Sequence, residues 1–360
     1  MKVDKRKIVD GLRLAALPLV PIYALITAIR NFLFDAKIFP STKVDATVIS
    51  VGNLTVGGSG KTPLVVYLTN LMKQSDKKVA VLSRGYGRKS TGFLFVSDGN
   101  QLITTVEECG DEIYQTVLEC SVPAAVCESR VEGAKQLLAK AGVDTIILDD
   151  AFQHRWLFRD LDILIFEQRF LLEASSLRRT FLPTGMLRED FSSIRRADII
   201  VLNRKFSGRK EIPGRLQKYF ETKKVFTAHY SAKGFFDIKK KTFYESKEFE
   251  GQNSLVISGI ANPHSFFNAL EQLHVDSGNR MVFRDHKFYT REDIQIIRKQ
   301  FYATNVHSVI TTQKDAVKLM QFTKELDDID IYYLKIELQF DNEKDFIKEI
   351  FKKLSEPKTK

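Results

Sequence analysis

Short apolar runs alternate with helix-like stretches along the middle of the chain, from Ala46 to about Tyr230. The apolar runs contain few polar residues, as is typical of parallel strands that are buried on both faces. The expected strands are residues 46–51, 78–82, 145–148, 163–166 and 197–202. Helix-like stretches such as 63–73 and 130–141 lie between them. Strands separated by helices predict a doubly wound, mostly parallel α/β sheet.

The pattern changes over residues 231–253, where two polar, strand-like stretches flank three consecutive lysines. We interpret 231–253 as an exposed hairpin that links two domains, with strands at 234–238 and 242–249. A smaller α/β pattern follows. Its expected elements are strands 254–258, 306–311 and 331–338, helices 263–273 and 292–301, and a closing amphipathic helix 341–353. The predicted units are a phosphate-loop core domain at 36–230, a smaller α/β domain at 254–353 and a frayed tail at 354–360.

The first 35 residues have a third pattern, a basic start followed by an uncharged, mostly apolar run at 14–29. As a helix this run would span about 24 Å, short of the roughly 30 Å hydrocarbon core of a bilayer. Pro18 and Pro21 would also confine the helix to its second part. We therefore expect 1–35 to be a membrane-associated segment that lies in the interface, with a spanning helix and a buried core helix as alternatives. A signal peptide is disfavoured, because no small-residue cleavage site follows the run.

Composition and charge narrow the range of partners. The 360 residues carry a net charge of +10, which favours a nucleotide, a nucleic acid or an acidic membrane surface as partner. The sequence has no recognisable nucleic-acid-binding module, so nucleic acid is not an expected partner. Cys109, Cys120 and Cys127 are odd in number and lack Cys-x-x-Cys spacing. They predict free thiols in a reducing, cytosolic environment, without a disulfide framework or a zinc site.

The strongest local signal is the stretch Gly-Gly-Ser-Gly-Lys-Thr at residues 57–62. It follows the first expected strand and leads into a helix, which is the context of a phosphate-binding loop. Glycines let main-chain N–H groups converge on phosphate oxygens, and Lys61 would reach the β- and γ-phosphates while Thr62 offers its hydroxyl to Mg²⁺. Thr55 stands where the usual pattern has its first glycine. The predicted ATP-binding residues are Thr55, Val56, Gly57, Gly58, Ser59, Gly60, Lys61 and Thr62.

Two adjacent carboxylates, Asp149 and Asp150, directly follow the expected strand 145–148. Open α/β sheets bind ligands at the carboxyl ends of their strands. In phosphate-loop enzymes a carboxylate at this position holds Mg²⁺, directly or through water. Both residues are therefore predicted Mg²⁺ ligands, and the alternative is that one of them only caps the next element.

Several charged or glycine-rich islands gain no role from their spacing alone. They are Arg84-Gly85-Tyr86-Gly87-Arg88, Gly110-Asp111-Glu112, Leu187-Arg188-Glu189 and Phe283-Arg284-Asp285-His286. A solvated turn explains the first island, and a helix N-cap explains the acids of the second. A lone histidine such as His286 is more often structural than catalytic.

Taken in order, these motifs resemble the tetraacyldisaccharide 4'-kinase family of lipid A biosynthesis. The resemblance is carried by 51–63 (VGNLTVGGSGKTP), 83–88 (SRGYGR), 110–112 (GDE), 149–154 (DDAFQH), 182–189 (LPTGMLRE), 259–263 (GIANP), 285–286 (DH) and 311–315 (TTQKD). Each motif is weak alone, but the ordered set is specific and reaches from the N-terminal apolar segment to about residue 320. The chain departs from the usual family pattern at Ile113, Ala151, Asp190, Lys287 and Gln313.

The resemblance implies a two-domain α/β kinase with its site in the cleft between the domains. Its reaction would transfer the γ-phosphate of Mg-ATP to the 4'-hydroxyl of an acylated glucosamine disaccharide 1-phosphate, giving lipid IVA. It implies a peripheral or monotopic protein on the cytosolic face of the inner membrane. From the phosphate loop alone, the alternative is a GTPase or ATPase switch or a metallochaperone, although a clear guanine-reading Asn-Lys-x-Asp motif is absent.

The resemblance also implies roles for individual residues. Asp111 would pair with His286 to activate the acceptor hydroxyl, and Lys61 would be the third catalytic residue. The implied metal ligands are Thr62, Asp149, Asp150 and Glu189. The implied contacts to the acylated disaccharide are Arg84, Tyr86, Arg88, Gln153, His154 and Arg188.

Overall fold

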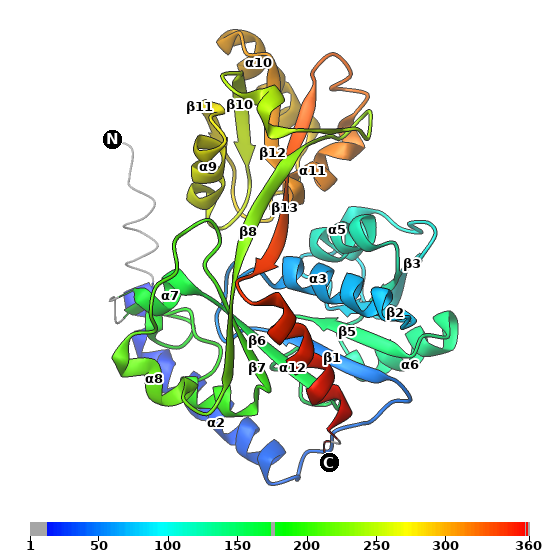
Figure 1. Ribbon diagram of the computed structural model, residues 1–360, viewed down its shortest axis with the longest axis vertical. Coiled ribbons are helices and arrows are strands. Elements are labelled where there is room, and N and C mark those ends of the chain that lie inside the picture. The colour runs from blue at the N-terminus through cyan, green and yellow to red at the C-terminus, as the bar shows by residue number, and fades with distance from the viewer. Residues whose placement is uncertain (1–12, 174–176, 357, 359–360) are drawn as a thin grey trace.

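The computed structural model describes residues 13–173, 177–356 and 358. They form a mixed α/β structure around one curled, mostly parallel sheet of 13 strands, which runs through the whole length of the molecule (Figure 1). In sheet order the strands are β11 (Asp276–Val282), β10 (Asn253–Ser258), β12 (Ser308–Thr312), β13 (Ile331–Phe340), β8 (Lys224–Asp237), β7 (Ile199–Asn203), β6 (Leu161–Glu167), β1 (Thr47–Gly52), β5 (Thr145–Asp149), β2 (Val79–Ser83), β4 (Pro123–Val126) and β3 (Leu94–Asp98), with β9 (Phe243–Tyr244) paired to β8.

The helices cover both faces of this sheet (Figure 1). Beside the first half of the sheet they are α3 (Lys61–Gln74), α4 (Val106–Cys109), α5 (Asp111–Cys120), α6 (Arg130–Ala141), α7 (Gln168–Leu172) and α8 (Gly214–Phe220). Beside the second half they are α9 (Pro263–Gln272), α10 (Arg291–Thr304) and α11 (Gln313–Leu319). The last helix, α12 (Glu343–Ser355), returns to the first half and starts two residues later than expected.

Strand β1 lies in the middle of the first half, parallel to β5 on one side and to β6 on the other. Its side chains alternate between two apolar layers, because successive residues of a strand point to opposite faces. Ile49 packs in a cluster with Leu64 and Leu68 of α3, whereas Val48 packs with Leu137 of α6. All five strands expected between 46 and 202 are present. Nearly all of their residues are buried, which explains why their sequences are apolar.

The segment around residue 230 differs from the expectation. A single strand of 14 residues, β8, runs through this position, pairing first with β7 in parallel and then with β13 in antiparallel orientation. The sheet is therefore continuous across residue 230, where the sequence predicted the end of one domain. A hairpin follows, but the expected strand 242–249 contributes only β9 and is completed by a 3₁₀ helix at Ser246–Phe249.

Three strands were not predicted from the sequence, namely β3, β4 and β11. β3 and β11 lie at the two edges of the sheet, and every residue of β11 except Ser277 is exposed or half-buried. β4 is only four residues long. Edge and very short strands need fewer apolar residues, so their sequences do not stand out from loops.

The N-terminal apolar run forms a 3₁₀ turn at Leu17–Leu19 and then helix α2 (Val20–Asp35), with Pro21 in its first turn. Together they are long and apolar enough to cross a membrane by length and composition, but only 6% of the most apolar window is buried in the structure. Exposed side chains include Ile22, Leu25, Ile26 and Ile29. The alternative of a buried core helix is therefore wrong, whereas an interfacial or spanning helix stays a prediction.

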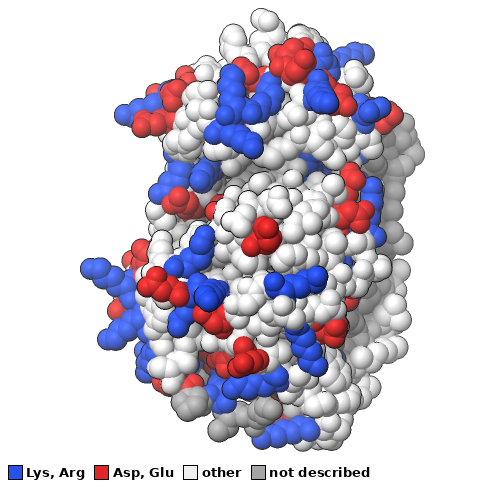
Figure 2. All heavy atoms as spheres, turned by 90° about the vertical axis from the view of Figure 1, so that its right-hand side faces the viewer, with Lys and Arg blue, Asp and Glu red and all other residues white. Residues whose placement is uncertain are grey.

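Charged side chains of both signs are mixed over the face that holds α5 and α6, without a large patch of one sign (Figure 2). The net positive charge of the chain is thus spread out on this face. The three cysteines are free and buried. Burial raises the pKa of Cys109 and Cys120 to about 12, so neither thiol is reactive near neutral pH.

Candidate active site

The loop between β1 and α3 is held open by glycines and by two buried asparagines. Gly57 and Gly60 have φ values of 106° and 98°, a region that L side chains rarely adopt. A Cβ on Gly60 would also lie 2.2 Å from the amide nitrogen of Asn203. Asn203 donates to the main-chain oxygen of Ser59 (3.1 Å), and Asn53 donates to the Ser59 hydroxyl (3.0 Å). These contacts fix the loop that leads into α3.

Helix α3 presents its N-terminus to a pocket. Its first turn contains no acidic side chain, and the residue at its N-cap position, Gly60, provides no side-chain cap. The first N–H groups of the helix are therefore free to bind an anion, which the helix dipole also favours. Lys61 and Thr62, the first two residues of the helix, both line the pocket.

Asp150 is held in place by two cations. Lys61 Nζ lies 3.7 Å from Asp150 Oδ1, and Arg188 Nη1 donates to both carboxylate oxygens at 2.8 and 3.0 Å. Burial by itself would raise the pKa of Asp150, but Lys61 and Arg188 outweigh it and lower the pKa below its usual value. Asp150 is therefore ionised, and its charge is shared with the lysine that would contact phosphate.

Asp149 is in the opposite situation. It is 1% exposed, and within the described part of the chain neither of its carboxylate oxygens has a hydrogen-bond partner. Burial and the nearby Glu112 raise its pKa to about 7, against the opposing effect of Lys61. A buried carboxylate without partners beside a phosphate loop is a group that a divalent cation would satisfy.

The four residues expected to hold metal are not brought together as a set. Thr62 and Asp150 line the pocket, whereas Glu189 is buried in ion pairs with Arg196 and, at 4.0 Å, with Arg30. Among residues 13–173, 177–356 and 358, no group of three or more His, Cys, Asp or Glu side chains is arranged to hold a metal ion. Asp149, the last residue of β5, does not line the pocket, so the metal role of these residues stays a prediction.

Asp111 and His286 lie side by side although 175 positions separate them in the sequence. Asp111 is the first residue of α5, and His286 lies in the loop between β11 and α10 with a φ of 55°. His286 Nδ1 is 3.3 Å from Asp111 Oδ2, and His286 Nε2 is 3.1 Å from Lys314 Nζ. An ammonium can only donate, so Nε2 holds a lone pair and Nδ1 carries the proton that is donated to Asp111.

Two lysines of α11 complete the surroundings of Asp111. Lys318 Nζ lies 3.5 Å from Asp111 Oδ2, and Lys314 Nζ lies 3.9 Å from the same oxygen. Burial would raise the pKa of Asp111, but the hydrogen bond from His286 and the two lysines lower it to about 2. Asp111 is therefore a carboxylate at every physiological pH.

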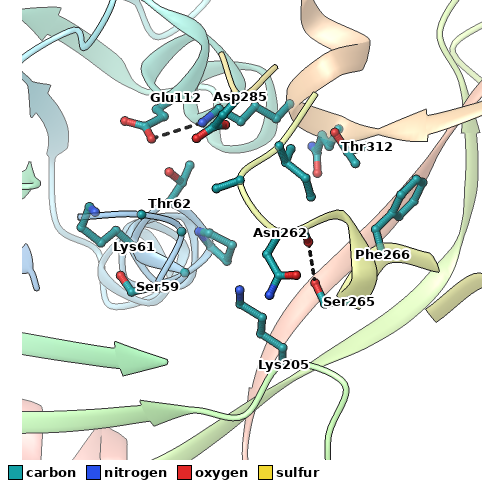
Figure 3. Close-up of a pocket in the computed structure, with 18 of the residues that line it drawn as sticks. Ser59, Lys61, Thr62, Glu112, Lys205, Asn262, Ser265, Phe266, Asp285 and Thr312 are labelled. Atoms are coloured by element: carbon teal, nitrogen blue, oxygen red, sulfur yellow. Dashed lines mark hydrogen bonds and ion pairs between the residues drawn. The ribbon is translucent and has the colours of Figure 1, made fainter. Parts of the chain in front are cut away.

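Lys314, Lys318 and Glu112 were given no role in the predicted site, although Glu112 and Lys314 lie within motifs of the family resemblance. Lys314 and Lys318 are four residues apart on α11, which places them on the same face of the helix. Lys314 also reaches Glu112 at 3.6 Å, the upper dashed contact in Figure 3. The spacing of the two lysines could have indicated a shared target, but not which acid it is.

The pocket has a volume of about 450 Å³ and lies between the phosphate loop and the elements that follow β8. In Figure 3, Ser59, Lys61 and Thr62 stand on one side, and Asn262, Ser265 and Phe266 stand on the other. Lys205 points toward the gap between them. The wall away from the loop includes an apolar group of residues, which are Phe206, Ile260, Phe266, Leu334 and Ile336.

The residues expected to contact the disaccharide are divided by the structure. Tyr86 and Arg188 line the pocket, and the Tyr86 ring centroid lies 5.0 Å from that of His286. Arg84 is exposed outside the lining set, and Arg88 is a buried partner of Glu128.

Gln153 and His154 lie behind the loop. The Gln153 amide donates to the main-chain oxygen of Asn53 at 2.9 Å. Burial and nearby Arg130 lower the pKa of His154 to about 4, so its imidazole is neutral. Their surroundings suit a supporting role better than direct contact with a ligand in the pocket.

Comparisons with known proteins agree on one family. The family model described as tetraacyldisaccharide-1-P 4'-kinase matches residues 12–355. A tetraacyldisaccharide 4'-kinase from Halothermothrix orenii is 34% identical over 358 residues, covering 94% of this chain and 92% of that protein. One from Flavobacterium johnsoniae is 35% identical over 340 residues, covering 92% and 94%. Among solved structures, LpxK from Aquifex aeolicus in complex with ATP matches with a TM-score of 0.75 and 32% identity, over 95% of this chain and 99% of that one.

Proposed function

The chain belongs to the tetraacyldisaccharide-1-phosphate 4'-kinase family, and we propose that its pocket transfers the γ-phosphate of ATP to the 4'-hydroxyl of a tetraacyldisaccharide 1-phosphate. This activity is a step of lipid A biosynthesis, with lipid IVA as the product. The observation that carries the assignment of residues is the position of His286, which lines the same pocket as Lys61 and Thr62 and has Asp111 behind it.

ATP would bind with its phosphates on the loop and its base toward the apolar wall. The free N–H groups at the start of α3 and the Lys61 ammonium suit the phosphate oxygens. Phe206, Phe266 and Leu334 offer a surface on which a purine can be buried. Lys205, whose ammonium lies 3.0 Å from Glu167, stands between these two parts of the pocket.

The residues beside the loop fit a divalent cation. Thr62 and Asp149 would hold it, because the hydroxyl lines the pocket and the buried carboxylate has an unmet need for a positive partner. Mg²⁺ bound there would neutralise the charge that develops on the phosphate oxygens. Asp150 would act beside it by orienting Lys61 and Arg188, with which it is already paired.

His286 would accept the proton of the acceptor hydroxyl at Nε2. Asp111 holds the opposite nitrogen, which fixes the tautomer and stabilises the imidazolium that forms, as carboxylates do for other catalytic histidines. Lys314 occupies Nε2 at 3.1 Å, so the sugar hydroxyl would take its place there. Lys314 would then remain close to Asp111 and Glu112 as a nearby positive charge.

The acceptor is a lipid, and the outer face of α2 suits a membrane surface. Ile22, Leu25, Ile26 and Ile29 are each at least 50% exposed and lie along that face. An exposed apolar face on a helix without acidic residues in its first turn favours the interface of a bilayer. Because ATP is cytosolic, the cytosolic face of the inner membrane is the side we propose.

Phosphate transfer to purified tetraacyldisaccharide 1-phosphate tests this function. We expect the protein to consume ATP only when the acceptor is present, and Lys61→Ala to abolish transfer while the melting temperature stays near that of the parent. Lys299→Ala, which removes an exposed lysine of α10, is the matched control and should keep full activity. Acceptor-independent ATP hydrolysis would favour the switch alternative, and near-normal transfer by Lys61→Ala would remove the role of the loop lysine.

A further inference from the structure

Helix α2 has an inner face as well as an outer one. Tyr23 and Arg30 are seven residues apart, which is about two helical turns, so they point in the same direction. Both are half-buried against the core, whereas Ile22, Ile26 and Ile29 are exposed. The hydrogen bonds of this inner face lead to two sides of the phosphate site.

The first path starts at Arg30. Its guanidinium Nη2 donates to the main-chain oxygen of Gln153. The Gln153 side chain donates to the main-chain oxygen of Asn53 at 2.9 Å. Asn53, which is fully buried, donates in turn to the hydroxyl of Ser59 at 3.0 Å. Three successive contacts thus connect the helix to the middle of the phosphate loop.

The second path starts at Tyr23. Its hydroxyl donates to the main-chain oxygen of Arg188 at 3.2 Å. The Arg188 side chain holds both oxygens of Asp150, and Asp150 lies 3.7 Å from the Lys61 ammonium. The helix therefore supports the segment that positions the phosphate-binding lysine as well as the loop itself.

Other contacts fasten the same helix without reaching the pocket. Asp35 at the helix end forms ion pairs with Arg195 and, at 2.7 Å, with Arg155. The Arg195 side chain is 66% exposed, as expected for an attachment at the surface. The pair with Arg195 provides a comparison, because it holds the helix end and neither Asp35 nor Arg195 lines the pocket.

We propose that Tyr23 and Arg30 are positioning residues, through which the membrane-facing helix α2 sets the geometry of the phosphate loop and of Arg188. The helix is then a part of the active site's support in addition to an anchor. Loss of either contact lowers turnover even where membrane binding is intact. The part that concerns turnover rests on the proposed kinase function, whereas the part that concerns ATP affinity does not.

The experiment compares Arg30→Ala and Tyr23→Phe with Arg195→Ala in the full-length protein. Transfer is measured with the acceptor in detergent micelles, ATP affinity by calorimetry, and membrane binding by sedimentation with vesicles of phosphatidylethanolamine and phosphatidylglycerol. We expect Arg30→Ala to lower kcat about tenfold and to raise the Kd for ATP several-fold, because small displacements of catalytic groups are costly. Tyr23→Phe should have a smaller effect of the same kind, and Arg195→Ala neither.

Vesicle binding should stay near the parent value in all three variants, since the exposed isoleucines are unchanged. Arg30→Lys keeps one donor and should recover part of the ATP affinity. Equal kcat and ATP affinity in Arg30→Ala and Arg195→Ala would overturn the proposal, as would a loss of turnover that only follows a loss of vesicle binding. If the parent protein transfers no phosphate, the kinase function fails, and the ATP affinities still decide whether the helix supports the loop.

Discussion

The groups around His286 are arranged so that one carboxylate serves one histidine and two lysines. Asp111 contacts His286, Lys318 and Lys314 within 3.9 Å, and it is 4% exposed. Water screens little at such burial, so each contact has a stronger effect than at the surface. Removal of Asp111 would leave the cations around it without their shared counter-charge. Its loss should therefore affect both the histidine and the local structure, and an experiment must separate the two.

A double-mutant cycle separates catalysis from stability. Asp111→Asn and His286→Ala should each lower kcat by on the order of 10²-fold or more, because the pair acts on the same proton. The double variant should be little worse than the poorer single variant, since residues that act as one unit are not additive.

The melting temperatures provide the control for this cycle. Lys287→Ala is a matched surface variant, because it removes a neighbouring side chain that pairs with Asp293 at 2.7 Å and does not line the pocket. It should leave kcat unchanged. Additive rate losses that run parallel to lost stability would mean that Asp111 and His286 are independent structural residues.

For individual residues, the sequence could predict only contacts between neighbours in the chain. Lys61 and Thr62 belong to one short motif, and their position on the pocket follows from the loop itself. Asp111 and His286 come from elements far apart in the chain, so only the family resemblance suggested that they pair. Glu189 stays a predicted metal ligand, but its ion pairs with the half-buried Arg30 of α2 and with Arg196 of the 3₁₀ helix Phe191–Arg196 are indicated by no local pattern.

Among the helices and strands, α2 is of particular interest for function, because its two faces differ. The outer face is a stripe of large apolar side chains, of which Ile22 and Ile26 are 56% and 60% exposed. Stripes of this kind on a monomer usually mark an interaction surface. The inner face carries the polar contacts described above, so the orientation of the helix relative to the core is fixed.

Charges placed on the outer face should release the protein from membranes. We expect the double variant Ile22→Asp/Ile26→Asp to lose most of its sedimentation with anionic vesicles, because both side chains would have to leave the apolar layer. Its melting temperature should change little, since neither residue is buried. Ile296→Asp, at a 55% exposed position of α10, is the matched control and should bind as the parent does. Equal binding by the α2 variant would place the membrane contact elsewhere.

Element prediction from the sequence succeeded where burial is uniform and failed where it is not. β1, β5 and β7 are almost entirely buried, so their apolar runs are unmistakable. β8 is half-buried over 229–232 and exposed at Lys233, because it crosses from one half of the sheet to the other. A half-buried strand resembles a domain linker in the sequence, which explains why the continuous strand across residue 230 was not predicted.

The whole molecule is held together across its middle by three kinds of connection. β8 and β13 pair over most of their length and carry the sheet from one half to the other. Helix α12 returns from the second half, and its Phe346 and Ile350 are buried in the same core as Ile49 of β1. The contacts of Asp111 with His286 and α11 join the two halves again at the active site. These connections make separate unfolding of either half costly.

We therefore expect one cooperative unfolding transition for the whole chain, and two probes can check this. Trp156 is the only tryptophan and packs against Phe34 and Phe39 in the first half, with ring centroids 4.8 and 5.0 Å away. Its fluorescence reports on that half, whereas far-ultraviolet circular dichroism reports on both. Coincident melting curves are the expected result for a single transition. A circular-dichroism curve with two steps, only one of which follows Trp156, would show that the halves unfold independently.

Low pH should weaken the contact that Asp111 makes between the two halves of the molecule. The pKa of Asp111 is lowered to about 2 in the folded protein, from an ordinary value near 4. A lowered pKa means that its contribution to stability is complete above about pH 4 and disappears as the pH falls toward 2. Asp111→Asn should therefore lower the melting temperature at pH 7 but flatten its dependence on pH between about 4 and 2. If the parent and the variant lose stability equally over that range, the carboxylate between the two halves is not what stabilises their contact.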